Sequence, residues 1–303
     1  MNRGVLYALS AYLMWGVFPI YFKAVQGVPP TEVLAHRVLW SLVFVALLLA
    51  AMRNGRWLLN LRASNVRHTF IASALLVSVN WVIYIWAVQA GRVVDASLGY
   101  FINPLVNVLI GALFLHERLR PTQWAAVLLA AVGVAWLTWQ AGAPPWIGLA
   151  LALTFASYGL LRKTAPLGAL EGLAIETALL TPLALAWLLW LAWTGSSVFV
   201  AGVDGTGGAS PWQSLLLVLA GPITAIPLLL FAAGARRIPF TTLGLLQYVG
   251  PTLQLLLGVY LYREPFDAAK LAGYTAIWLA LAVFSADSLW LAWRQRGRRA
   301  AAD

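Results

Sequence analysis

The chain of 303 residues is 62% hydrophobic and only 10% charged, and it carries a net charge of +10. Soluble domains average about 45–50% apolar and about 25% charged residues, so a water-soluble fold could not bury this much apolar surface. The chain has no cysteine, which excludes disulfides, thiol catalysis, iron–sulfur clusters and cysteine-bound zinc. The composition therefore predicts an all-α integral membrane protein.

Ten apolar stretches follow one another along the chain, each close to the roughly 20 residues that a membrane helix needs. The first is too long and too aromatic for a cleavable signal peptide, so we expect it to remain as the first span. The predicted spans are Val5–Val25, Glu32–Met52, Thr69–Ala90, Ala96–Leu115, Thr122–Gln140, Trp146–Leu161, Glu171–Trp193, Pro211–Gly234, Thr241–Tyr262 and Ala268–Trp293.

Basic residues are distributed unevenly between the two ends of these spans. With the N-terminus in the cytoplasm, fifteen of the 20 lysines and arginines fall on the cytoplasmic side, and Arg37 lies within a span. This asymmetry follows the positive-inside rule, so we predict that both termini are cytoplasmic. It also accounts for the net charge, and we expect no nucleic-acid partner. The four basic residues on the outside are Lys23, Arg92, Arg263 and Lys270.

The two halves of the chain share a weak repeat. At an offset of 147 residues a proline, a glycine and a glutamate recur, as Pro104, Gly111 and Glu117 and then as Pro251, Gly258 and Glu264. Because each half holds five predicted spans, the two copies would cross the membrane in opposite directions, as an inverted repeat. We predict a first repeat at 1–141, a second at 142–293 and a basic cytoplasmic tail at 294–303. The segment Thr194–Ser210 is expected to be a flexible outer loop with no fold of its own.

Polar residues recur at helical spacing within several of the predicted spans. Steps of seven and four place Ser73, Asn80 and Tyr84 on one stripe of a helix. Amide side chains face lipid only at a cost, so we expect such stripes to point into the bundle. Two interpretations remain open, a packing seam between helices and the lining of a substrate cavity near the midplane. The residues predicted to line the cavity are Trp15, Asn80, Tyr84, Tyr100, Asn103, Asn107, Gln247 and Gln254.

Two charged residues, Arg37 and Glu176, lie about five residues inside predicted spans. A charge at the centre of a span costs roughly 2.5–3.5 kcal/mol on insertion scales. In one interpretation each is near enough to an interface to reach water or to satisfy a neighbour, as His36 would with Glu32 one turn away. In the other, Glu176 is a proton-linked or substrate-cation site and Arg37 binds a carboxylate.

Several stretches of the chain are typical of one family of carriers. They are Glu32–Trp40, Asn80–Trp86, Ser97–Leu105, Glu117–Leu119, Leu246–Pro251 and Arg263–Pro265. Over almost the whole chain the sequence resembles the EamA-type permeases of the RarD kind, in the drug/metabolite transporter superfamily. The resemblance implies ten spans in two five-helix EamA repeats, and a carrier of small organic solutes or metabolites in the bacterial plasma membrane.

The absence of two sequence motifs argues against ATP-driven transport and against metal-dependent catalysis. No G-x-x-x-x-G-K-[ST] sequence is present, so uphill transport would depend on a proton, a counter-substrate or a separate partner. The three histidines lie on different segments and no H-E-x-x-H occurs, so we expect no catalytic residues, no metal and no cofactor.

We therefore predict a carrier, not an enzyme, that moves a small organic solute by alternating access, in the direction of export. It would contact the lipid bilayer, and a homodimer is left open. The alternative is a membrane sensor or scaffold that keeps the carrier fold without moving solute.

Overall fold

The computed structural model describes residues 3–53, 64–114, 120–165, 167–201, 210–235, 237–238 and 246–300. Within these ranges all regular secondary structure is helical, which confirms the predicted all-α class. Among the described residues, seven helical segments, with Arg3–Ala24 taken as one, are long and apolar enough to cross a membrane, and three further apolar helices are shorter. The shorter ones are Val93–Val106, Trp146–Arg162 and Val249–Leu261.

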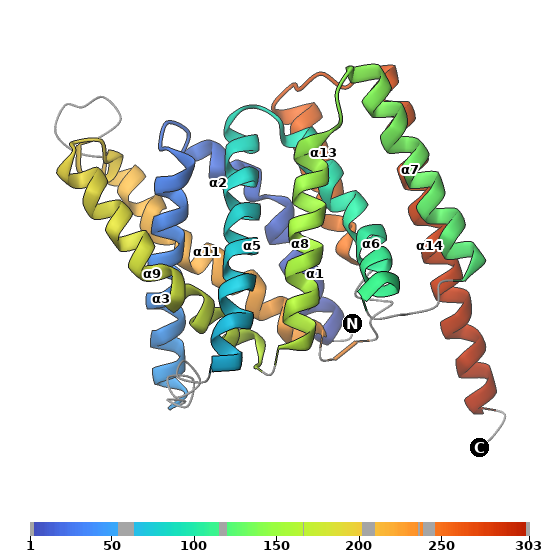
Figure 1. Ribbon diagram of the computed structural model, residues 1–303, viewed down its shortest axis with the longest axis horizontal. Helices are drawn as coiled ribbons and strands as arrows, with labels where there is room; N and C mark the ends of the chain where they lie inside the picture. Colours follow the sequence, from blue (N-terminus) through green and yellow to red (C-terminus); the bar gives the residue numbers. More distant parts are fainter. Residues whose placement is uncertain are drawn as a thin grey trace. The chain divides into compact units, whose positions relative to one another are not determined.

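Each predicted span coincides with one helix, or with two consecutive helices, as far as it is described (Figure 1). The helices are α1 (Arg3–Gly16), α2 (Phe18–Ala24), α3 (Pro30–Ala51), α5 (Ser64–Gln89), α6 (Val93–Phe114), α7 (Pro121–Ala141), α8 (Trp146–Thr164), α9 (Ala169–Trp193), α10 (Val198–Ala201), α11 (Pro211–Ala235), α13 (Val249–Leu256), the π-helical turn η1 (Leu257–Leu261) and α14 (Ala268–Ala300).

The predicted first span is broken in two at Val17, between α1 and α2. Pro19 has no amide hydrogen, so the carbonyl of Trp15, four residues earlier, cannot receive the usual helical hydrogen bond. The sequence contains this signal, because proline interrupts the backbone ladder of a helix at a fixed place.

The chain forms two compact units. Unit 1 comprises Met1–Val17, Gly91–Ser157 and Ala233–Asp303, and unit 2 comprises Phe18–Ala90 and Tyr158–Ala232. Each unit therefore takes helices from both halves of the chain. The boundaries of the two compact units differ from those of the predicted repeats at 1–141 and 142–293. The repeats stay a prediction about symmetry.

In unit 1, α7 and α14 lie side by side (Figure 1). A Cβ on Gly133 of α7 would lie 2.9 Å from the carbonyl oxygen of Gly273 on α14, so the two backbones touch where neither carries a side chain. Next to this pair, the rings of Phe101, Tyr274 and Trp278 pack edge to face with centroids 5.9–6.2 Å apart. These aromatic contacts anchor α6 against α14.

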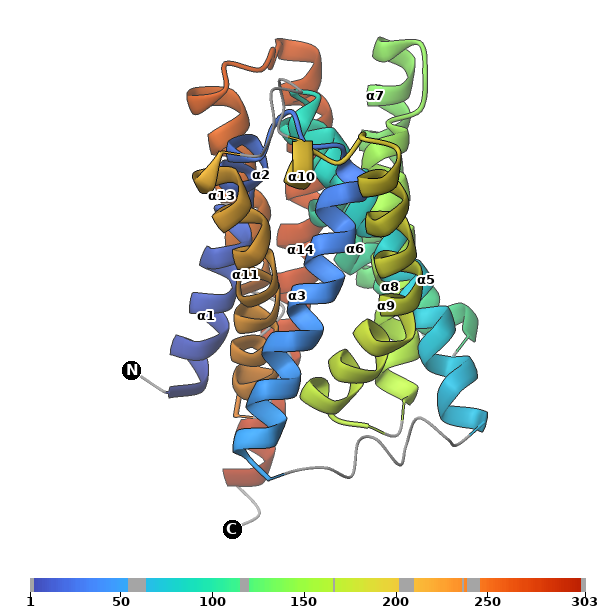
Figure 2. The ribbon, with the colours of Figure 1, turned by 90° about the vertical axis from the view of Figure 1, so that its left-hand side faces the viewer.

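In unit 2, α3 and α9 lie side by side (Figure 2). Val45 and Leu49 of α3 pack against Leu173 and Ala174 of α9, together with Ala225 of α11. This apolar contact holds three helices of the unit together around the polar groups described below.

The expectation of an unstructured outer loop at Thr194–Ser210 is wrong at its start, because α10 forms within it. The carboxylate of Glu32 accepts hydrogen bonds from the Val198 and Phe199 amides, both at 3.1 Å, and from the Ser197 hydroxyl at 2.8 Å. Glu32 thus satisfies the free amides at the start of α10. Residues 202–209 lie outside the described part.

The structure adds detail to two further expectations. Beside the suggested pairing of His36 with Glu32, the Glu32 carboxylate accepts hydrogen bonds from the segment that begins α10. The helix α14 also continues beyond Trp293 to Ala300, so the predicted tail at 294–303 begins as a continuation of the last helix.

Candidate functional site

Arg37 of α3 lies inside unit 2, with only 4% of the residue exposed. Its Nε donates a hydrogen bond of 2.6 Å to Oγ1 of Thr224 on α11. The guanidinium carbon lies 4.1 Å from the centre of the Trp81 ring, and Phe22 and Phe18 lie at 5.5 and 5.7 Å. Ring faces attract a cation, so three aromatic rings and a hydroxyl stabilise this charge inside the unit. Arg37 is therefore satisfied by neighbouring side chains, and its role in binding a carboxylate stays a prediction.

A close approach of the α3 and α11 backbones positions the hydroxyl partner of Arg37. A Cβ on Gly221 of α11 would lie 2.3 Å from the carbonyl carbon and oxygen of Trp40 on α3. The hydroxyl of Ser41 donates a hydrogen bond of 3.4 Å to the Gly221 carbonyl. One turn away along both helices, Arg37 meets Thr224. Glycine at position 221 therefore allows the contact that brings Thr224 to the guanidinium.

The stripe predicted on α5 is buried within unit 2. Ser73, Asn80 and Tyr84 are each 0–3% exposed, and Val77 continues the stripe between them. The Tyr84 ring packs edge to face on Phe22, with centroids 5.7 Å apart, and Phe22 in turn faces Arg37. Asn80 and Tyr84 thus share a helix face close to the Arg37 site, and Ser73 extends the stripe to a second charged group.

That second group is Glu176 of α9, which is 2% exposed. Its Oε1 accepts a hydrogen bond of 2.7 Å from the Ser73 hydroxyl, and its Oε2 accepts one of 3.4 Å from the hydroxyl of Tyr158 on α8. Nη1 of Arg162, also on α8, lies 3.7 Å from Oε1. The carboxylate is therefore held by two hydroxyls and one cation.

The two charged sites of unit 2 lie along the same helix. Ser73 contacts Glu176 and Trp81 contacts Arg37, and these two α5 residues are eight positions apart. At a rise of about 1.5 Å per residue this is about 12 Å along the helix axis. An anionic and a cationic group thus stand roughly two turns apart in one unit, each with its own partners.

Among the residues predicted to line the cavity, Gln254 and Trp15 meet in unit 1. Nε2 of Gln254 donates a hydrogen bond of 3.1 Å to the carbonyl oxygen of Trp15. This is the carbonyl that Pro19 leaves without its helical donor. Gln254 therefore supplies a hydrogen bond to the acceptor that is left at the break between α1 and α2. Oε1 of Gln254 is buried and has no hydrogen-bond partner among the described residues.

Four other predicted residues belong to α6 and to the segment before α13, also in unit 1. Asn103 is 1% exposed, and its Oδ1 has no hydrogen-bond partner within the described part of the chain. Tyr100 packs edge to face on Phe155, with centroids 6.2 Å apart, and Gln247 is half-buried. The side chain of Asn107 lies outside the described residues. The predicted cavity residues therefore divide between the units, with Asn80 and Tyr84 in unit 2.

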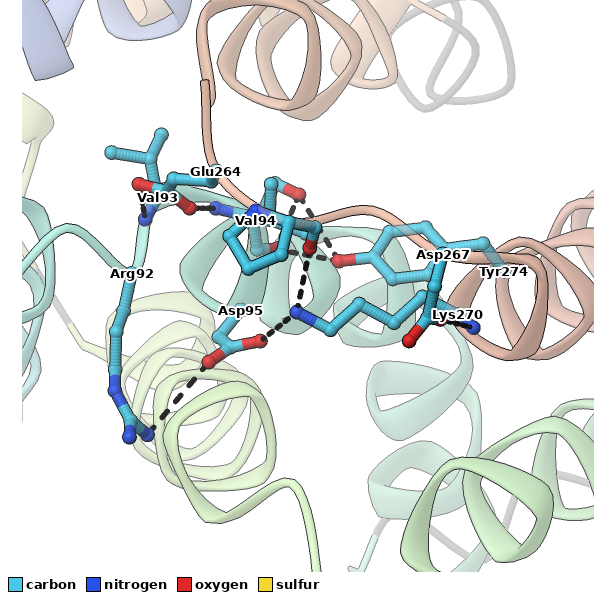
Figure 3. A network of polar contacts seen from close by, with 10 residues as sticks. Arg92, Val93, Val94, Asp95, Glu264, Asp267, Lys270 and Tyr274 are labelled. Atoms are coloured by element: carbon cyan, nitrogen blue, oxygen red, sulfur yellow. Dashed lines mark hydrogen bonds and ion pairs between the residues drawn. The ribbon is translucent and has the colours of Figure 1, made fainter. Parts of the chain in front are cut away.

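A polar network joins the start of α6 to the segment between η1 and α14 (Figure 3). Glu264 accepts hydrogen bonds of 2.7 and 2.8 Å from the amides of Val93 and Val94, the first residues of α6. Asp95 lies between two cations, 3.8 Å from Arg92 and 3.9 Å from Lys270. The ion pairs are partly exposed and contribute little, whereas the two amide bonds satisfy a helix terminus. Glu264 is thus a structural residue that ties η1 to α6.

Comparisons with known proteins identify the family. Residues 2–139 match the EamA-like transporter family. An uncharacterized transporter of Pseudomonas aeruginosa is 47% identical over 98% of this chain and 97% of its own length. Protein RarD of Streptomyces exfoliatus is 46% identical over 99% of this chain and 94% of its own, and protein RarD of Escherichia coli is 43% identical over 95% and 96%.

The chain belongs to the EamA-like transporter family. It is a multi-pass membrane protein, related over nearly its whole length to proteins named RarD. A crystal structure that is 21% identical to this EamA-like protein superimposes with a TM-score of 0.59 and covers 93% of this chain and 97% of the other. At this identity the match shows a shared fold and nothing about activity.

Sequence reasoning missed several partners in this EamA-like protein. Thr224 and Trp81, which hold Arg37, come from other helices, and no local pattern links them to position 37. Arg162 is one of the fifteen basic residues predicted on the cytoplasmic side, and in the structure it contacts Glu176. Its spacing from Tyr158, one helical turn, is the one signal that could have placed both on the same face of α8.

Proposed function

We propose that this protein is a secondary carrier of the bacterial inner membrane that moves a small organic solute outward by alternating access. The observation that carries the proposal is the presence of two buried, oppositely charged side chains within the membrane helices of a member of a transporter family. Buried charge is costly in a membrane and typically marks a path for a substrate or an ion. A protein that only spans the membrane does not need buried charged side chains.

The proposed topology is ten spans in two inverted repeats, at 1–141 and 142–293, with both termini in the cytoplasm. The seven long and three shorter apolar helices of the described residues support the number of spans. The excess of basic residues in alternate connections supports the orientation. Inverted repeats would let a central site face each side of the membrane in turn.

In this proposal Arg37 binds an anionic group of the solute, such as a carboxylate. Its guanidinium is already desolvated and lies against Trp81, and a fixed planar fork of donors suits a carboxylate. Asn80 and Tyr84, on the adjacent face of α5, would supply further polar contacts. Unit 1 carries a separate set of proposed lining residues, in which the buried amide oxygens of Asn103 and Gln254 would accept hydrogen bonds from a polar ligand. Tyr100, Asn107, Gln247 and Trp15 complete the proposed set in unit 1.

Glu176 is the proposed coupling group, because a carboxyl group inside a membrane can bind and release a proton as it changes its exposure. Its hydroxyl partners, Ser73 and Tyr158, can rearrange to suit either protonation state, since a hydroxyl both donates and accepts.

The proposal is tested in cells that overproduce the protein, by measuring metabolites in the cytosol and in the medium. We expect one class of compound to leave the cytosol and accumulate outside, and we expect Asn80→Ala to abolish this without lowering the amount of protein in the membrane. Val79→Ala is the matched control, because Val79 is the preceding residue of α5 and is 49% exposed. Unchanged metabolite levels with abundant folded protein would favour the sensor or scaffold.

A further inference from the structure

Among the described side chains, Arg162 is the cation that pairs with Glu176, and it makes two further contacts. Nη1 lies 3.7 Å from the Glu176 carboxylate, and Nη2 donates a hydrogen bond of 3.3 Å to the carbonyl oxygen of Gly168, just before α9. The guanidinium carbon also lies 5.3 Å from the centre of the Phe70 ring on α5. The side chain is 16% exposed, whereas that of Glu176 is 2% exposed. Arg162 therefore connects a buried carboxylate to the more exposed end of α8.

The other elements that pack around Glu176 present few charged groups. From α5 the carboxylate meets the hydroxyl of Ser73, and from α8 it meets Tyr158 and Arg162. The contacts of this part of α9 with α3 and α11 are apolar, through Val45, Leu49 and Ala225. Within the described contacts, the charge on Glu176 is therefore opposed by a single cation, which is part of the protein itself.

Gly172 makes room for this cation. It lies one turn before Glu176 on α9, and a Cβ at this position would overlap Nη1 of Arg162 and lie 2.5 Å from the guanidinium carbon. Any larger side chain would displace the guanidinium from its place beside the carboxylate. A glycine here therefore keeps a place for the arginine on the face of α9 that carries Glu176.

We propose that Arg162 is a tethered counter-ion that competes with a proton for Glu176, and that Gly172 provides the space it occupies. When Glu176 is ionised, the guanidinium pairs with it. When a proton from water adds to a carboxylate oxygen, the negative charge disappears, the ion pair is lost, and Arg162 keeps its bond to the Gly168 carbonyl. No other bond is made or broken, and the reverse step returns the proton to water. This inference rests on the proposed coupling role of Glu176 and names the residues that regulate it.

The first test does not require a substrate. The apparent melting temperature of the purified full-length protein is measured in detergent between about pH 3 and about pH 9, a range that includes the ordinary carboxyl pKa of about 4 as well as raised values. Arg162→Gln, Glu176→Gln and the double variant form a cycle that isolates the interaction of the two side chains. We expect a coupling of about 2 °C or more at the alkaline end, falling toward zero at the acid end as Glu176 takes up its proton.

Two glycine variants test the space for the guanidinium. The same cycle is repeated in a Gly172→Ala background, where the interaction between Arg162 and Glu176 should no longer depend on pH. In a Gly159→Ala background the pH-dependent coupling should be intact, because the added methyl group on α8 has nothing within 4 Å. If Gly172→Ala does not fold, Gly172→Ala combined with Arg162→Lys should fold and recover the coupling, because lysine lacks the planar head that meets the methyl group. A coupling that is absent, or equal at every pH, overturns the proposal.

The second test separates this inference from the proposed function. Exchange of a mixed metabolite pool is followed in proteoliposomes at the same pH values, with the wild type and Arg162→Gln. Transport by the wild type together with a pH-independent coupling would overturn the role of Arg162 and leave the carrier in place. A pH-dependent coupling with no transport by the wild type would support the ion pair and overturn the carrier.

Discussion

The contact of α3 with α11 at Gly221 allows a sharp prediction about stability. A Cβ at this position would lie 2.3 Å from the backbone of Trp40, whereas ordinary van der Waals contact begins at 3.4 Å. The two helices would therefore have to separate by about 1 Å. The hydrogen bond between Arg37 and Thr224, now 2.6 Å, would lengthen to about 3.6 Å and would no longer qualify as one. We predict that Gly221→Ala both overpacks the interface and weakens the contact that holds a buried charge.

The expected cost follows from two opposing effects. Overpacking costs about 1–3 kcal/mol, and loss of a buried charge-assisted hydrogen bond adds about 1.5–3 kcal/mol. Alanine in place of glycine within a helix returns about 1 kcal/mol. The net loss is about 1.5–5 kcal/mol, which corresponds to an apparent melting temperature lower by about 3 °C or more.

The assay is the folded fraction of detergent-purified protein after heating, read by size-exclusion chromatography. The control is Gly159→Ala, which makes the same chemical change on α8 with no atom within 4 Å. The control should melt at the wild-type temperature or slightly above it. If Gly221→Ala melts together with Gly159→Ala, the close approach of α3 and α11 is wrong, and with it the placement of Thr224 beside Arg37.

Three further predictions concern the polar contacts at helix ends and breaks. Glu264→Ala should cost about 1–2 kcal/mol and speed hydrogen exchange at the first amides of α6, because both lose their acceptor; unchanged exchange there would contradict the contact. Glu32→Ala should expose the segment around α10 to protease, since its amides lose a carboxylate, and equal cleavage of Glu32→Ala and wild type would refute this. Gln254→Ala should cost about 1 kcal/mol in the wild type and less in a Pro19→Ala background, where the helical amide at position 19 is restored; equal costs in a double-mutant cycle would show that Gln254 does not repair the proline break.

The fold class and the helical segments could be predicted from the sequence because both depend on local composition. A membrane helix must satisfy its own backbone hydrogen bonds and needs a long apolar run, so hydropathy alone locates it. Burial of the α5 stripe could be predicted for the same reason, since Ser73, Asn80 and Tyr84 recur at helical spacing.

The partners of the charged groups could not be predicted, because they come from distant parts of the chain. Arg37 and Thr224 are separated by 187 residues, and Ser73 and Glu176 by 103. The same limit explains why α10 was not foreseen. A four-residue helix has no periodic pattern of its own, and the carboxylate that satisfies its first amides lies at position 32. Glu264 shows the same principle at the start of α6, where the cap comes from 170 residues away.

Charge counts alone also gave an incomplete account of Arg162. Its position at the cytoplasmic end of a predicted span made it one of fifteen residues that set the orientation. In the structure its aliphatic stem carries the guanidinium back to Glu176, where Gly172 leaves space for it. A basic residue at a span end can thus contribute both to topology and to a buried site.

The measurement that tests the central claim most directly is counterflow in proteoliposomes. Purified protein is reconstituted into vesicles loaded with a metabolite mixture, and the uptake of labelled or mass-resolved compounds is compared with that of empty liposomes and of Glu176→Gln. The account predicts that one class of small organic solute exchanges selectively, and that Glu176→Gln retains this exchange but loses its dependence on a pH gradient. If folded and inserted protein moves none of the compounds, the chain is not a carrier of small metabolites, and the proposed function is contradicted.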